Sequence, residues 1–230
     1  MTSDKEPFAG RIVSSMKISK KLLLVFFVTC AAGWAQSTSS SLKTVDFRNF
    51  SYPWVYPNSW PDHLQWMSLR LRQRIQLVNG KWDNRDDAER ADGSQFSGLT
   101  LEGVQYVRLS SGNSDDAIVV LRYDSGGTQN HYWVYVYGNS GGVPKLLGFF
   151  HAGDRAYYGL DQVFVKDRIL NVRLFDPKLR EGDCCSSGYI NYQFRWNGEG
   201  FEAISNPARG RTDSMSRRPV SVFGLPIDPH

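Results

Sequence analysis

The sequence predicts an all-β fold, an antiparallel meander or sandwich-like single domain that follows a cleaved signal peptide. Three observations favour this class. Short apolar segments recur between Gly- and Asp-rich turns, no long segment has the 3.6-residue period of an amphipathic helix, and 13% of the 230 residues are aromatic. A chain of this length fits one good-sized domain.

The N-terminus has the order of a secretory signal peptide. Lys17, Lys20 and Lys21 precede an apolar run at 22–29, and small residues follow up to Ala35. The run is too short for a bilayer span, which takes about 20 residues. We expect residues 1–35 to be removed, with Met1 or Met16 as the start, and the mature protein to be secreted or periplasmic.

A lipoprotein is the alternative way for this N-terminus to reach a membrane. Cys30 would then become the lipidated first residue, but bacterial lipoprotein signals usually carry a small residue before that cysteine, and Thr29 stands there. An uncleaved anchor is a further alternative. Otherwise we expect membrane contact only through the signal peptide.

The mature chain divides into a linker at 36–43, an all-β domain at 44–205 and a disordered tail at 206–230. The linker is rich in Ser and Thr, and the tail contains four prolines with little periodicity. The aromatic segment 45–56 is expected to be extended, because Pro53 and Pro57 exclude a helix there.

Strict alternation predicts the next strand, at 69–77. Its apolar residues alternate with a basic and polar set, namely Leu69, Leu71, Ile75 and Leu77 against Arg70, Arg72, Arg74 and Gln76. The polar stretch 83–98 is a long loop or one helical turn. Further strands are expected at 99–109, 117–123, 131–137, 143–150, 162–165, 169–175, 189–196 and 201–204.

The charge distribution argues against a nucleic-acid partner. The formal net charge of +4 comes mainly from the two ends, because residues 36–205 contain 18 basic and 19 acidic residues. A nearly neutral domain lacks the basic surface that binds phosphate backbones.

Two turns contain motifs that resemble functional loops. Residues 138–142, Gly-Asn-Ser-Gly-Gly, resemble the nucleophile loop of chymotrypsin-like serine proteases, with Ser140 as nucleophile, but they also suit a hairpin turn. Residues 107–120 resemble the calcium loops of FG-GAP-type repeats, yet only Asp115 and Asp116 supply carboxylates there. We interpret both as turns and expect no metal, no cofactor and no catalytic residue.

Cys184 and Cys185 are neighbours, and no other cysteine remains after export. We predict a vicinal disulfide that stiffens a loop; an intermolecular bridge or two free thiols are the alternatives.

A second group of polar and aromatic residues lies at 151–158. His151, Asp154, Arg155, Tyr157 and Tyr158 form a possible binding loop, with ordinary loop packing as the alternative.

Several of these elements together resemble a family of secreted bacterial proteins, the LppP/LprE lipoproteins. The likeness rests on Gly182-Asp-Cys-Cys-Ser-Ser and on the Arg195-Trp-Asn-Gly segment, and it covers roughly 104–204. It implies a β fold and no particular reaction. We therefore expect an exported, non-catalytic β module that binds an envelope protein or a small ligand through loops. The alternatives are a secreted hydrolase that uses Ser140 or the 151–158 region, and a redox-responsive structural protein.

Overall fold

The computed structural model describes residues 41–55, 63–70, 73–112, 114–127, 130–181, 185–211 and 222–223, without the side chains of Glu181 and Cys185. The chain separates into two compact units, Met1–Ser37 and Thr38–His230, and every described residue belongs to the second. The predicted signal peptide and Cys30 lie outside the described residues, so their roles stay predictions.

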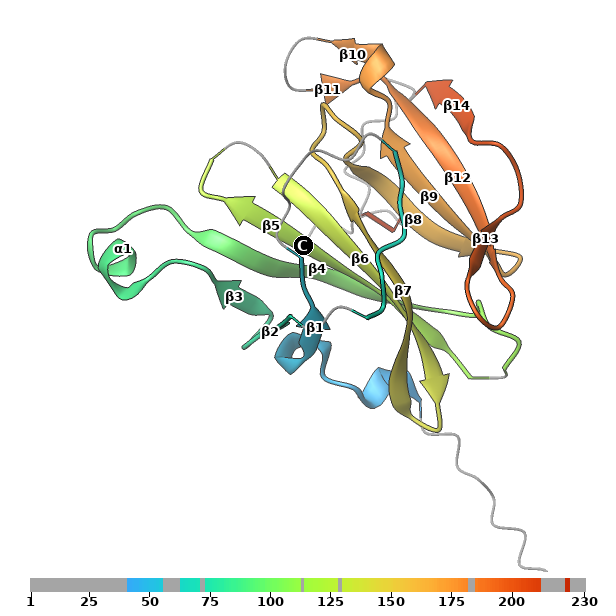
Figure 1. Ribbon diagram of the computed structural model, residues 1–230, viewed down its shortest axis with the longest axis horizontal. Coiled ribbons are helices and arrows are strands. Elements are labelled where there is room, and N and C mark those ends of the chain that lie inside the picture. Colours follow the sequence, from blue (N-terminus) through green and yellow to red (C-terminus); the bar gives the residue numbers. More distant parts are fainter. Residues whose placement is uncertain are drawn as a thin grey trace, which may run out of the picture. The chain divides into compact units, whose positions relative to one another are not determined.

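The first sheet contains five antiparallel strands in the order β3-β4-β5-β6-β7 (Figure 1). The strands are β3 Lys81–Asp83, β4 Ser97–Val107, β5 Asp116–Ser125, β6 Asn130–Ser140 and β7 Val143–Ala152. Each strand pairs with its predecessor in the sequence, so the sheet is a meander. The strands expected between residues 99 and 150 are confirmed, with their ends shifted by at most three residues.

The second sheet has the order β13-β12-β9-β8, and β14 also pairs with β12. Its strands are β8 Leu160–Lys166, β9 Ile169–Phe175, β12 Gly188–Trp196, β13 Phe201–Ala203 and β14 Ala208–Arg211. β13 pairs with one end of β12, and β14 pairs with the other. The sheet thus extends past residue 205 into the predicted tail, because β12 offers more edge than the three-residue β13 can pair.

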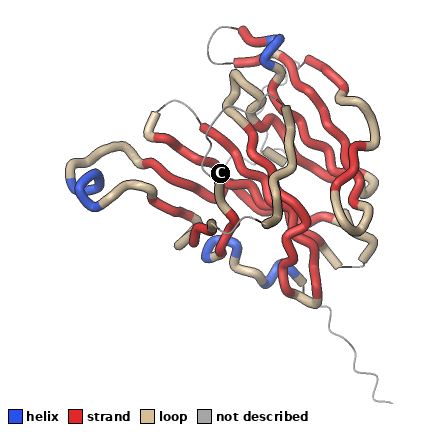
Figure 2. Tube along the Cα trace, viewed as in Figure 1, coloured by secondary structure: helices blue, strands red, loops and turns tan. Residues whose placement is uncertain are grey.

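Short elements complete the described part of the chain, and most of it is strand (Figure 2). They are the 3-10 helices η1 Leu42–Thr44, η2 Phe47–Asn49 and η3 Pro177–Leu179, the helix α1 Asp87–Ala91, and the strands β1 Ser51–Pro53, β2 Arg74–Gln76, β10 Arg180–Glu181 and β11 Cys185–Ser186. The single turn of helix allowed for residues 83–98 is α1. Among the described residues, no helix has the length and apolar character needed to span a bilayer.

Two expectations for the N-terminal half need correction. The segment 45–56 is not extended throughout, because η2 forms one helical turn ahead of Pro53, with the Asp46 side chain accepting a hydrogen bond from the Arg48 amide. Among the described residues of 69–77, only Arg74–Gln76 form a strand, and Leu69 is 51% exposed. Alternation alone does not set the length of a strand, because each strand residue needs a paired neighbour, and the pairing with β1 ends at Arg74.

Aliphatic side chains from both sheets meet in one core, which we call the inner core. β5 and β6 contribute Ile118, Val120, Val134 and Val136, and the second sheet contributes Val163, Leu170, Val172 and Leu174. All eight are fully buried. The two sheets therefore pack face to face as a sandwich, with side chains at every second position of each strand pointing inward.

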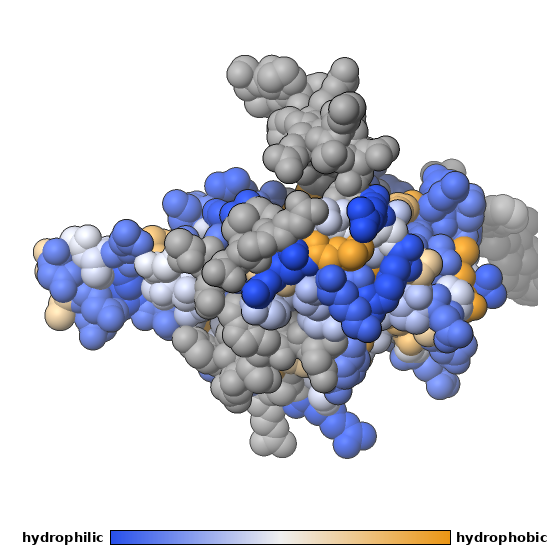
Figure 3. Space-filling model, turned by 90° about the horizontal axis from the view of Figure 1, so that it is seen from above, coloured by the Kyte–Doolittle hydropathy of each residue, from blue (hydrophilic) through white to orange (hydrophobic). Residues whose placement is uncertain are grey.

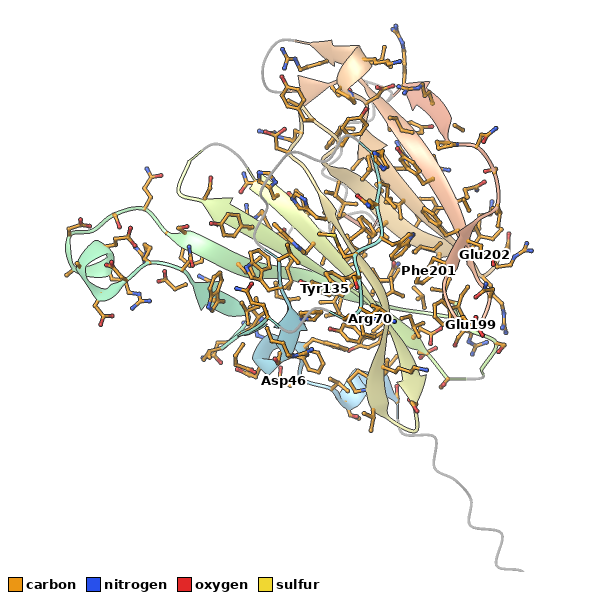
Figure 4. The ribbon with its side chains drawn as sticks, in the orientation of Figure 1. Asp46, Arg70, Tyr135, Glu199, Phe201 and Glu202 are labelled. Carbon is orange, nitrogen blue, oxygen red and sulfur yellow. The ribbon has the colours of Figure 1, made fainter. Side chains whose placement is uncertain are left out.

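The opposite face of the first sheet carries a second buried cluster, the aromatic layer. The chain from Leu42 to Leu77 supplies part of it, and Trp133, Tyr135, Tyr137 and Phe149 supply the sheet side. Phe50 meets Tyr137, Tyr52 meets Tyr135 and Trp54 meets Trp133, at centroid distances of 5.4, 5.0 and 4.3 Å. Successive ring contacts move two residues forward along the N-terminal segment and two residues back along β6, so this segment lies antiparallel across β6. Figure 4 labels Tyr135 within this layer.

Exposed large apolar side chains are scattered rather than gathered into a patch. Among the described residues they are Leu69, Val78, Val143, Tyr157 and Ile204. The face shown in Figure 3 is largely hydrophilic. Scattered exposure of this kind is ordinary for a globular surface.

Candidate functional site

Ser140 lies at the tip of the β6–β7 hairpin, in register with Val143. Gly141 and Gly142 have φ values of +64° and +88°, the left-handed backbone that a two-residue hairpin loop requires. His131 lies nine residues back along β6, about 30 Å away at strand rise, and His151 pairs with Trp133 near that same end. The hairpin interpretation is confirmed, and the fold keeps Ser140 far from both histidines.

The two carboxylates of the 107–120 turn have structural partners. Asp116 is fully buried and accepts hydrogen bonds from the amides of Leu109 and Ser110 at 2.9 and 2.7 Å and from the Ser110 hydroxyl at 3.0 Å. Asp115 pairs with Lys43 at 3.2 Å. Asp116 therefore holds the turn against the start of β5. Among the described residues, no group of three or more His, Cys, Asp or Glu side chains is arranged to hold a metal ion.

His131 and His151 form a stacked pair at one end of the aromatic layer. Nδ1 of His131 lies 3.0 Å from Nε2 of His151, the rings are nearly parallel, and each residue is 8% exposed. Burial lowers the pKa of His131, against the opposing effect of Asp154. Burial and the neighbouring His131 lower the pKa of His151 to about 3. The pair is therefore neutral at pH 7 and packs as part of the layer, with Trp133 4.4 Å from His151.

The other residues of the predicted binding loop point in different directions. The Asp154 side chain accepts hydrogen bonds from the backbone amides of Ala156 and Tyr157 at 2.8 and 3.1 Å, and Arg155 is exposed. Tyr157 is 41% exposed, and the Arg180 guanidinium lies 5.0 Å above its ring and donates to its hydroxyl. Tyr158 packs against the inner core. His151 packs at the end of the aromatic layer and Tyr158 packs against the inner core, so these two residues do not line one pocket.

The cysteine pair can be placed only in part. The Cys185 backbone pairs with Glu181 across the β10–β11 hairpin, while Cys184 and the Cys185 side chain lie outside the described residues. The vicinal disulfide stays a prediction.

An open cleft of about 540 Å³ lies beside the loop that carries α1. Its walls are Gln76, Val78, Lys81, Trp82, Asp83, Arg85, Arg90 and Phe96. Most of these residues belong to β3 or to the loop, which joins β3 to β4. The cleft is thus built on one edge of the first sheet.

A glycine contact and a helix cap shape the loop between β3 and β4. Gly98 of β4 has a φ of +155°, and a Cβ there would sit 2.0 Å from the Trp82 carbonyl oxygen, so a side chain would displace β3. Asp86 and Glu89 cap α1 reciprocally, each side chain accepting from the other's backbone amide at 2.9 Å. These contacts fix α1 and the C-terminal end of the polar segment, which the sequence predicts as a long loop or one helical turn.

One carboxylate in the cleft is shared by two arginines. Asp83 accepts from Nε and Nη2 of Arg85 at 3.1 and 2.9 Å and lies 3.4 Å from Nε of Arg90. The Arg85 hydrogen bonds are the main cause that holds the pKa of Asp83 far below its usual range. Arg85 also donates to the Ser94 carbonyl at 2.6 Å. These contacts therefore brace the wall of the cleft.

Two cations flank the Phe96 ring in the same cleft. Lys81 Nζ lies 5.9 Å and Arg85 Cζ lies 5.8 Å from the ring centroid. Trp82 forms a second aromatic wall and packs on Trp54 of the aromatic layer at 6.0 Å. Lys81 is exposed and forms no ion pair with a described residue. Aromatic walls beside an available ammonium suit a small anion that carries a flat apolar group.

Sequence reasoning did not single out this cleft. Trp82 and Phe96 bracket a polar segment 13 residues long, and Lys81 precedes it. Large aromatic residues at both ends of a charged loop are the available signal. Comparisons with family models, curated proteins and solved structures found no match to this chain. The resemblance to LppP/LprE lipoproteins therefore stays an expectation.

Proposed function

We propose that this protein is an exported, non-catalytic β module that binds a small aromatic anion in the cleft beside α1. The observation that carries the proposal is the Phe96 ring, with Lys81 and Arg85 at 5.9 and 5.8 Å from its centroid, in a cleft that Trp82 also lines. A ring of the ligand would lie against the aromatic walls, and its carboxylate or phosphate would meet the Lys81 ammonium. Specific binding sites commonly combine apolar walls with a few placed charges in this way.

The arrangement of charges favours an anion over a neutral ligand. Lys81, Arg85 and Arg90 line the cleft together with Asp83, and Arg90 also pairs with Asp87 of α1 at 2.7 Å. The Arg85 guanidinium donates its hydrogen bonds to Asp83 and to the Ser94 carbonyl. Lys81 is therefore the cation of the cleft that we expect to contact a ligand. Its flexible stem and three donors suit a phosphate or carboxylate oxygen without demanding one geometry.

Export and the cysteine pair are part of the same proposal. The basic, apolar and small residues of 1–35 support cleavage, and an oxidising compartment would allow Cys184 and Cys185 to join. Mass spectrometry of the protein recovered outside the cytosol tests both. We expect a chain that lacks about the first 35 residues and has no alkylatable thiol. A full-length chain, or two alkylated thiols, would contradict this part.

Calorimetric titration with phenyl phosphate tests the binding proposal. Benzyl alcohol is the neutral probe of similar shape, and inorganic phosphate is the anion without a ring. We expect saturable binding of phenyl phosphate, at least ten-fold weaker binding of inorganic phosphate, and none of benzyl alcohol. Raising the salt concentration should weaken binding, because the attraction is electrostatic.

Matched variants locate the binding site. Lys81→Gln should weaken phenyl phosphate binding about five- to ten-fold, and Phe96→Ala should weaken it as well. Lys145→Gln removes an exposed lysine from β7 and should change nothing. Equal weakening by Lys81→Gln and Lys145→Gln, or equal binding of the neutral probe, would reject the cleft as an anion site.

A further inference from the structure

A second open cleft, of about 410 Å³, lies on the loop that carries α1. Its walls are Asn84, Arg85, Glu89, Ser94, Gln95, Ser97, Ser125 and Gly126. Arg85 lines both this cleft and the one that contains Phe96, so its side chain belongs to a wall that the two clefts share. We call the second one the polar cleft, because no aromatic or aliphatic side chain lines it.

Three segments of the chain meet around the polar cleft. Two of them precede and follow α1, and they are joined where Asn84 donates its amide hydrogen to the Ser97 carbonyl at 2.7 Å. The third is the end of β5, where Ser125 lies directly opposite Ser97. Gly126 has a φ of +80°, and a Cβ there would lie 3.9 Å from the Gln95 carbonyl oxygen. The end of β5 therefore lies against the residues that follow α1.

Both charged side chains of the polar cleft already have partners within the protein. The Arg85 guanidinium donates to Asp83 and to the Ser94 carbonyl. The Glu89 carboxylate accepts from the Asp86 amide at 2.9 Å as part of the cap of α1. An anionic ligand group would have to compete with Asp83, and a cationic one would have to compete with the helix cap. The polar cleft therefore favours a neutral ligand group.

The other polar side chains of this cleft are amides and hydroxyls. Those of Asn84, Gln95, Ser97 and Ser125 form no hydrogen bond with a described residue. A carboxamide offers two donors and an acceptor, and a hydroxyl both donates and accepts. Ligand hydroxyl groups do the same, so a group with several neighbouring hydroxyls can satisfy such a set without carrying charge. This chemistry favours a sugar.

We propose that the polar cleft is a sugar subsite, and that the ligand of this protein is an aryl glycoside whose ring bears an acid group. The inference rests on the proposed function, because the ring and the anion bind in the cleft that contains Phe96. Since Arg85 lines both clefts, a sugar joined to that ring can enter the polar cleft while the ring stays in place. Linking the two groups increases affinity without adding a contact to either cleft.

Calorimetric titration of the protein with a matched pair of probes tests this inference. The para-carboxyphenyl glucoside carries the ring, the carboxylate and a sugar, whereas para-methoxybenzoate carries a methyl group in place of the sugar. We expect the glucoside to bind about five-fold more tightly, as a few added hydrogen bonds would give. Methoxybenzoate that binds as tightly as the glucoside would overturn the sugar subsite and leave the proposed anion site standing.

Matched variants assign the sugar to the polar cleft. Gln95→Ala and Ser125→Ala should each weaken binding of the glucoside about three- to five-fold and leave methoxybenzoate unchanged. Lys81→Gln should weaken binding of both probes. Ser205→Ala removes an exposed hydroxyl that follows β13 and should change neither. Glucoside binding that resists both Gln95→Ala and Ser125→Ala would contradict the assignment.

A third probe keeps the two proposals separate. If neither aryl acid binds, the proposed anion site is wrong, and methyl glucoside tests the polar cleft alone. We expect methyl glucoside to shift the backbone amide resonances of Gln95 and Ser125 in NMR spectra of the protein, in a saturable way, and to leave that of Ser205 in place. No shift at Gln95 and Ser125, or an equal shift at Ser205, would overturn the sugar subsite.

Discussion

The two sheets differ in how many of their faces are buried. The first has the inner core on one face and the aromatic layer on the other, so residues 117–121 of β5 are all fully buried. The second has its buried apolar cluster on the inner face, and β12 alternates between buried Ile190 or Phe194 and partly exposed neighbours. A strand covered on both sides needs apolar residues throughout, whereas a strand covered on one side needs them at every second position.

The two buried faces of the first sheet also differ in chemistry. The inner core is mostly aliphatic and joins two regular sheets. The aromatic layer joins the sheet to a segment with little secondary structure, whose backbone carbonyls need donors. Tyr52 donates its hydroxyl to the Phe47 carbonyl at 2.7 Å and Tyr135 donates to the Pro53 carbonyl at 2.8 Å. Tyrosine therefore suits this face, because it supplies apolar area and a donor together.

The largest expected effect comes from opening the aromatic layer. Trp133→Ala removes a fully buried ring that contacts Trp54 and His151, and should lower the free energy of unfolding by about 3–5 kcal/mol. Arg195→Ala, on the exposed face of the second sheet, should change it by less than about 0.5 kcal/mol. Urea unfolding followed by far-UV circular dichroism measures both. A similar loss of unfolding free energy in the two variants would contradict the difference in burial between the two sheets.

The next effect concerns adjacent acids at the start of β5. Asp116→Ala leaves the Leu109 and Ser110 amides without their acceptor and should cost about 2–3 kcal/mol. Asp115→Ala breaks only the partly exposed pair with Lys43 and should cost less than about 1 kcal/mol. Thermal unfolding of the two variants compares them. A larger loss for Asp115→Ala would mean that the turn is held by its surface charges.

A pH effect of about 2 kcal/mol should arise from the histidine pair. The folded pKa of His151 is about 3, below the ordinary value of 6.5 expected when the chain unfolds, so the unfolded state binds more protons between these values. Stability is therefore complete above pH 6.5 and falls as the pH drops toward 3, by about 2 kcal/mol between pH 7 and pH 5. His151→Phe should flatten this part of the stability profile. An unchanged profile would show that other groups control it.

The smallest effect tests the exposed face of the second sheet. Arg173 places its guanidinium 3.6 Å above the Tyr189 ring and pairs with Asp161 at 2.9 Å. Tyr189→Leu should cost about 0.5–1 kcal/mol, the usual contribution of a cation–π contact near solvent. A double-mutant cycle with Arg173→Met isolates the contact. A coupling as large as the loss in Trp133→Ala would mean that this face is also a core.

Sequence patterns located most of the regular strands. Turns such as Gly141-Gly142 and Asp167-Arg168 interrupt apolar segments, and the strands between them form as expected because neighbours in the sequence pair in a meander. The candidate site was harder to predict. Residues 83–98 have no period, and their arrangement depends on the close contact of Gly98 with β3 and on the salt bridges that Asp83 forms with Arg85 and Arg90.

By itself, the sequence determined the all-β class, most of the strands between residues 99 and 204 and the hairpin at Ser140, because alternation and turn chemistry act over a few residues. Tertiary structure alone decided which segments cover the sheets. The aromatic segment that includes Trp54 lies over β6, and Phe223 closes the sandwich beside Gly103. Both contacts join residues far apart in the chain, and their free energy comes from excluding water at a surface that exists only after the strands have paired.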